Sequence, residues 1–150
     1  DAPGLLQILI TASLLLHGIA HAIALVALIG QSGMGKPKRK IITTSWLFQW
    51  MLPRKAALIL MPVWILATLA FFGASASSWG VIIKGGWWAS LALIGAIVST
   101  AGVILVGGRW PGSPSENRGY LNSAVAMIMN LAIMTAMVWL QWLPTSWILR

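Results

Sequence analysis

The sequence predicts an all-α integral membrane protein, a bundle of four transmembrane helices with a short interfacial helix between the first and second spans. Composition is the first observation behind this prediction. Hydrophobic residues make up 59% of the 150 residues and charged residues 8%, with a mean hydropathy of +0.86. Soluble domains carry about a quarter charged residues, so these charges are too few to cover a water-soluble fold. A soluble globular domain, a disordered chain and a nucleic-acid-binding module are therefore excluded.

Four apolar runs are the second observation. Each approaches the roughly 20 residues that a helix needs to cross the hydrocarbon core, and none contains Asp, Glu, Lys or Arg. Isolated strands leave their backbone groups unsatisfied in lipid, so the runs are expected to be helices. Together they predict one four-helix transmembrane domain with spans at Leu5–Gly30, Ala56–Gly73, Trp87–Val106 and Tyr120–Leu143.

The basic residues predict the orientation. The net charge is +8, and most basic residues lie in the first and third connections between spans. Because cytoplasmic loops are enriched in Lys and Arg, these two connections are expected to be cytoplasmic and both termini non-cytoplasmic. The membrane is expected to be a plasma (inner) or energy-transducing one. The first connection holds Lys36, Lys38, Arg39, Lys40, Arg54 and Lys55, the third holds Arg109 and Arg118, and the opposite side holds Lys84 and Arg150.

The first connection has a basic part and an apolar part. Ile41–Leu52 is apolar, too short to span, preceded by basic residues and ended by Pro53. Such a segment is typical of a helix that lies in the interface, and a partner-binding helix is the alternative. Trp46, Trp50 and Trp110 fall near the predicted inner interface, where tryptophan is enriched. Contacts with lipid or a partner are expected from Trp46, Phe48, Trp50, Lys38, Arg39 and Lys40.

Two histidines in the first span are the main candidate site. His17 and His21 are four residues apart and therefore share one helix face, on which Ser13 precedes them. An ionisable side chain near the middle of a span is costly and indicates a functional site. Both rings are expected to be neutral, each with one nitrogen that accepts a hydrogen bond or binds a metal.

Three interpretations of this pair remain open. In the first, each histidine hydrogen-bonds a carbonyl or a polar group of a neighbouring helix. In the second, His17 or His21 is the axial ligand of a haem or (bacterio)chlorophyll. Gly18 beside His17 would let such a flat macrocycle approach the helix. In the third, the pair binds copper or zinc, although zinc normally needs a third protein ligand. The spans contain no carboxylate or cysteine that would supply one.

The third and fourth spans add polar groups. Asn130 is deep in the fourth span and is expected to hydrogen-bond across a helix interface, with His17 as a candidate partner. Methionines on its face, Met127, Met134 and Met137, either fill packing space or act as soft ligands. Small residues at four-residue spacing in the third span, Ser99 among them, allow close helix approach. Interhelical polar contacts are thus predicted for Ser13, Ser99 and Asn130.

Catalysis is not expected from this set of residues. The chain has no cysteine, and its carboxyl side chains, Asp1 and Glu116, lie outside the spans. Acid–base chemistry would therefore rest on the histidines alone, and no catalytic residue is predicted. In size, span count and the His17-Gly18 pair the chain resembles the small DoxX-like four-helix membrane proteins. The resemblance implies the layout and transfers no function.

These observations predict an accessory, non-catalytic structural subunit of a larger energy-transducing membrane complex, photosynthetic or respiratory. Its partners would be other integral membrane subunits and lipids, with no nucleic acid, and it would hold at most one haem or chlorophyll-type pigment. The alternative is a free-standing small membrane protein that binds copper, haem or a quinone between the first and fourth spans.

Overall fold

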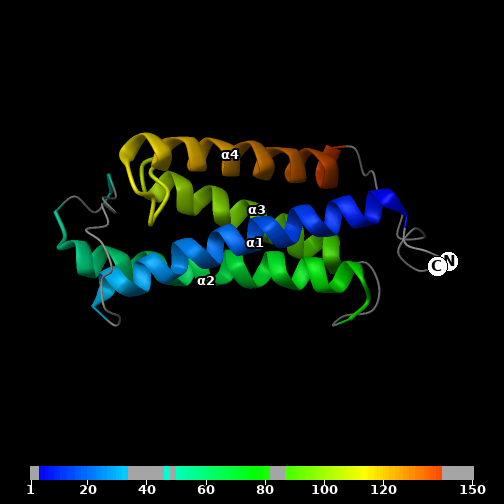
Figure 1. Cartoon of the computed structure of the whole chain (residues 1–150), viewed down its shortest axis with the longest axis horizontal. Coiled ribbons are helices and arrows are strands. Elements are labelled where there is room, and N and C mark those ends of the chain that lie inside the picture. The colour runs from blue at the N-terminus through cyan, green and yellow to red at the C-terminus, as the bar shows by residue number, and fades with distance from the viewer. Residues whose placement is uncertain (1–3, 34–45, 48–49, 82–86, 140–150) are drawn as a thin grey trace.

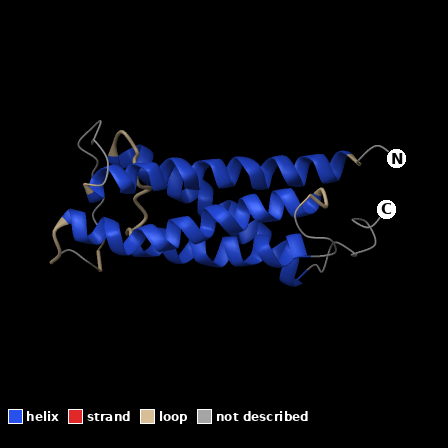
Figure 2. Ribbon diagram, turned by 90° about the horizontal axis from the view of Figure 1, so that it is seen from below, coloured by secondary structure: helices blue, strands red, loops and turns tan. Residues whose placement is uncertain are grey.

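The structure is a computed structural model that describes residues 4–33, 46–47, 50–81 and 87–139. These residues form four long α-helices and a short π-helical turn, and contain no strand (Figures 1 and 2). The helices are α1 (Leu5–Ser32), α2 (Pro53–Ser78), α3 (Trp87–Leu105) and α4 (Glu116–Met134), and the π-helical turn η1 (Thr135–Trp139) continues α4.

All four helices are long and apolar enough to cross a membrane, which confirms the predicted four-helix class. Two of them begin earlier than hydropathy predicts, because their first turns are polar. Pro53 is the first residue of α2, where its missing N–H costs nothing. The Ser115 hydroxyl caps α4 by accepting a hydrogen bond from the Arg118 backbone N–H. The predicted end of the fourth span, residues 140–143, lies outside the described residues.

The short interfacial helix predicted over residues 41–52 is not shown. Of this segment the structure describes Trp46, Leu47 and residues 50–52, which form turns and bends, and the remainder lies outside the described residues. Pro53 therefore begins α2 in this structure and does not end a preceding helix.

Aromatic side chains of α2 fill the centre of the bundle. Helices that are consecutive in the sequence pack along each other, whereas the backbones of α1 and α4, the first and last helices, make few contacts with each other. Trp64 and Phe71 are fully buried, and glycines of α3 make room for them. A Cβ atom built at Gly102 would lie 2.5 Å from Cζ3 of Trp64, and one at Gly95 would lie 3.0 Å from Cε1 of Phe71. The small residues of α3 thus receive aromatic rings.

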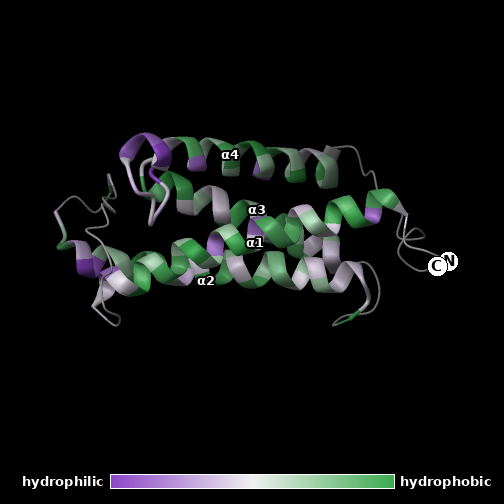
Figure 3. Ribbon diagram, in the orientation of Figure 1, coloured by the Kyte–Doolittle hydropathy of each residue, from purple (hydrophilic) through white to green (hydrophobic). Residues whose placement is uncertain are grey.

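The polar centre lies between two apolar clusters. One cluster, which includes Leu28, Trp64 and Trp110, occupies the end of the bundle where α2 and α4 begin. The other, which includes Leu14 and Phe71, occupies the opposite half. Hydrophilic residues gather at the end where α2 and α4 begin, while the outer faces of the helices are apolar (Figure 3). The outer surface therefore suits lipid, while His17, His21, Ser99 and Asn130 are buried inside the bundle.

Candidate functional site

The two histidines of α1 form the core of the site, near the middle of the bundle. His17 is 7% exposed and His21 is fully buried. Their ring centroids are 4.7 Å apart, and aromatic rings surround them. The centroid of Phe71 lies 4.5 Å from that of His17, and the centroid of Trp110 lies 4.9 Å from that of His21. Both imidazoles are therefore shielded from lipid on several sides.

Four hydrogen bonds form the network that includes the two histidines, and two of the bonds connect a histidine directly to α3 or α4. The Nδ1 atom of His21 lies 2.9 Å from the backbone oxygen of His17, and its Nε2 atom lies 2.8 Å from the Ser99 hydroxyl. The Asn130 amide Nδ2 lies 2.8 Å from the same hydroxyl. The Oδ1 atom of Asn130 lies 3.0 Å from Nε2 of His17. Side chains from three helices thus form one buried network.

Donor and acceptor chemistry fixes the direction of each bond. A carbonyl oxygen only accepts, so Nδ1 of His21 carries a proton, and in a neutral ring its Nε2 accepts. The Ser99 hydroxyl then donates to His21 and accepts from the Asn130 amide. The Oδ1 atom of Asn130 accepts from His17, whose proton is therefore on Nε2. The two histidines are thus held in opposite tautomers.

The structure brings most of the predicted polar residues together. The network joins His17, His21, Ser99 and Asn130, and in it His17 is bonded to Asn130, for which the sequence had named it as a candidate partner. Ser13 differs, because its side chain is exposed on the outside of α1. The buried stripe of α1 passes through Leu14, and the adjacent position is rotated by about 100° from it on a helix of 3.6 residues per turn.

The space beside Gly18 is occupied. A Cβ atom at this position would lie 2.8 Å from Cδ1 of Phe72, so a side chain of α2 fills the surface on which the sequence suggested a flat macrocycle. Three methionines of α4 and η1 also pack within the protein. Met127 contacts the cluster around Trp64, and Met134 and Met137 contact the cluster around Phe71.

Sequence reasoning missed the role of Trp110. This residue was expected at the membrane interface, but its ring is 7% exposed and packs against His21 and Trp64. The connection from α3 to α4 folds inward at Gly112, which has φ of +81° and lies so close to α1 that a Cβ would be 2.6 Å from that of Ala27. The sequence offered one indication of this inward turn. Trp110 is followed directly by Pro-Gly, a pair typical of turns.

A cavity of about 390 Å³ lies beside the network, between α1 and α4. His17, Ala20 and Ile23 line it from α1, and Asn122, Val125 and Ala126 line it from α4. The connection between α3 and α4 closes one end through residues 110–114. Ile23 and Val125 at its rim are 63% and 54% exposed, so the cavity opens on the outer surface of the bundle.

Few groups are free to hold a metal or cofactor. Among the described residues, no group of three or more His, Cys, Asp or Glu side chains lies close enough to hold a metal ion. Both ring nitrogens of His21 make hydrogen bonds, and so does Nε2 of His17. A ligand to His21 would displace an existing bond, whereas Nδ1 of His17 has no hydrogen-bond donor within the described part of the chain.

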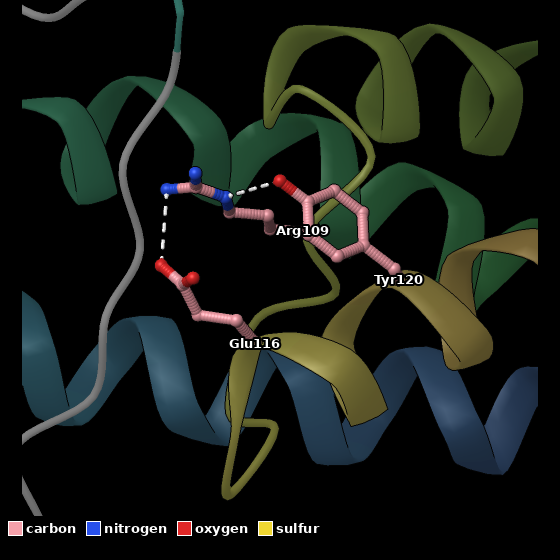
Figure 4. Close-up of polar contacts among 3 residues, drawn as sticks. All are labelled: Arg109, Glu116 and Tyr120. Carbon is pink, nitrogen blue, oxygen red and sulfur yellow. Dashed lines mark hydrogen bonds and ion pairs between the residues drawn. The ribbon is translucent and has the colours of Figure 1, made fainter.

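A charged cluster lies at the surface near the start of α4 (Figure 4). Arg109 donates through Nε to the Tyr120 hydroxyl at 3.0 Å, and its Nη1 atom lies 3.6 Å from Oε1 of Glu116. The hydrogen bond to Tyr120, followed by electrostatic interactions with Tyr120 and the Glu116 carboxylate, raises the pKa of Arg109. Arg109 therefore stays positive and fixes a cation at this end of the bundle.

The predicted interface residues are placed only in part. Trp46 is 55% exposed, and its indole N–H donates to the backbone oxygen of Ile104 at 2.6 Å, so this ring lies against the end of α3. Trp50 is 77% exposed. Lys38, Arg39, Lys40 and Phe48 lie outside the described residues.

Comparison with known protein families, with curated proteins and with solved structures finds no match to this chain.

We predict that Ser99→Ala lowers the free energy of unfolding by about 1–2 kcal/mol, because it leaves His21 and Asn130 without their shared partner. Ser90→Ala is the matched control, since Ser90 is on the same helix and exposed. Denaturation in mixed micelles, followed by circular dichroism, measures both variants. Equal effects of the two substitutions would contradict the assigned network.

Proposed function

We propose that this protein is a non-catalytic membrane protein that binds a small lipophilic molecule between α1 and α4. The cavity of about 390 Å³ between these helices is the observation behind the proposal, since small-molecule sites typically measure about 300–1,000 Å³. Its rim residues Ile23 and Val125 are exposed on the outer face. A ligand would therefore enter sideways from the bilayer.

The wall of the cavity combines apolar surface with a few polar groups. Ala20, Ile23, Val125 and Ala126 supply apolar contacts from both helices. His17 supplies a polar contact near the middle of α1, and its ring is held in place by Asn130. Apolar walls with a few fixed polar groups are typical of ligand sites, and such a wall suits a molecule with an apolar body and one polar head.

Of the ligands that the sequence suggests, the geometry favours a lipophilic molecule of the quinone/quinol class over copper, haem or chlorophyll. Phe72 fills the surface beside Gly18, and His21 has no ring nitrogen to spare. A metal ion would find one imidazole nitrogen of His17, where tetrahedral sites take at least three protein ligands. The non-catalytic role rests on the placement of Glu116, which is exposed and paired with Arg109.

An accessory subunit of an energy-transducing complex is the second candidate function. The observation that favours it is the poor burial of the fourth helix. In its most apolar stretch 17% of residues are buried, against 33–44% in the other three helices. A partner subunit would cover this face. Native sizing in mild detergent tests the candidate, and elution as a small species that retains no other subunit would contradict it.

We also propose that the α1–α2 and α3–α4 connections face the cytoplasm, in an inner or energy-transducing membrane. The basic residues Arg54, Lys55, Arg109 and Arg118 lie at one end of the bundle, as expected for the cytoplasmic side. Because the chain has no cysteine, Asn117→Cys and Val81→Cys each create a unique label site. A membrane-impermeant maleimide should modify Val81→Cys in intact cells and Asn117→Cys only after permeabilisation. The reverse pattern would overturn the orientation.

We predict that Ala20→Phe lowers the affinity for radiolabelled 4-octylphenol by about tenfold or more, because the new ring occupies the cavity. Ala12→Phe adds the same ring to an exposed position of α1 and should leave the affinity unchanged. Binding is measured with the protein in lipid nanodiscs, and protein-free nanodiscs correct for partition into lipid. No saturable binding, or equal binding by both variants, would reject the proposed function.

A further inference from the structure

We infer that the ligand of the α1/α4 cavity is a hydrogen-bond donor, a lipophilic molecule with a hydroxyl group such as a phenol, a quinol or a long-chain alcohol. The inference rests on the proposed function and specifies the ligand class. It follows from the way in which the buried network fixes the proton of His17.

The backbone of α1 sets the first proton. The carbonyl oxygen of His17 accepts from Nδ1 of His21, because no carbonyl donates. A neutral His21 then has a lone pair on Nε2. A neutral ring is favoured at this depth, because a charged side chain in the middle of a span is costly.

The direction of the His21 hydrogen bond fixes the direction of the bonds that Ser99 and Asn130 make, and through them the proton of His17. The Ser99 hydroxyl uses its single proton on Nε2 of His21, so it accepts from the Asn130 amide. The oxygen of that amide group consequently points to His17 and accepts from Nε2. Reversing the amide would ask the Ser99 hydroxyl to donate twice, which one proton does not allow.

His17 is therefore left with a lone pair on Nδ1. Its side chain lines the cavity and keeps 7% of its surface exposed, and none of the described residues donates to Nδ1. Elsewhere in the wall, the Asn122 amide donates to the Ser113 hydroxyl at 3.1 Å. A hydroxyl group of a ligand would pair with Nδ1, whereas a ligand that only accepts would place two lone pairs together.

The matched probes are 4-octylphenol and 4-octylanisole, which differ in that the methyl ether has no O–H. Competition against radiolabelled 4-octylphenol, with the wild-type protein in nanodiscs, gives the two affinities. The phenol should bind about fivefold to tenfold more tightly, the ratio typical of one buried hydrogen bond. In His17→Phe, which keeps an aromatic side chain and removes both ring nitrogens, the two probes should bind alike.

A spectroscopic measurement keeps the inference testable if His17→Phe does not fold. The chain has two histidines, so selective ¹⁵N labelling gives few signals. The ¹⁵N signal of the unprotonated nitrogen of His17 should shift when 4-octylphenol is added and stay in place with 4-octylanisole.

The outcomes separate the inference from the proposed function. Tighter phenol binding together with the shifted His17 signal supports the hydroxyl assignment. The inference is overturned if the two probes bind with equal affinity and the His17 signal does not shift. If Ala20→Phe still weakens the binding of both probes in that case, the cavity remains a binding site. Absence of saturable binding by either probe rejects both the site and its assigned ligand.

Discussion

The constraint behind this structure is that lipid offers no partner for an imidazole N–H, so each histidine of α1 depends on groups inside the protein. His21 uses the backbone of its own helix and the hydroxyl of Ser99, and His17 uses the amide of Asn130. These bonds bring α3 and α4 to α1 at one level of the bundle. On either side of that level, the helices pack together through the two apolar clusters.

Aromatic packing then decides how closely the helices approach. Trp64 and Phe71 of α2 lie against glycines of α3, and Phe72 covers Gly18 of α1. The Trp64 indole N–H has no acceptor among the described residues, so this side chain contributes shape and surface. Because these rings occupy the centre, α1 and α4 meet through side chains more than through close backbone packing. The cavity beside His17 lies in the space that this arrangement leaves between the two helices.

The four helices and part of the network were predictable from the sequence, because charge-free apolar runs and isolated polar residues in mid-span are local signals. Asn130 and His17 have few alternative partners at their depth. Three features needed tertiary information. Trp110 turns inward because its connection packs on Ala27, Ser13 faces outward because the buried stripe passes through Leu14, and Phe72 takes the space over Gly18 because α2 lies there. The spacing of residues along one helix does not reveal which side chains of the other elements will pack against each of its faces.

If one buried network sets the protons of both histidines, ¹⁵N spectroscopy of the histidine-labelled protein without added ligand should detect two different tautomers. We expect one ring protonated on Nδ1, that of His21, and one protonated on Nε2, that of His17. Two rings in the same tautomer, or rapid exchange between tautomers in either ring, would show that the network does not set these protons and would remove the basis for assigning His17 as an acceptor.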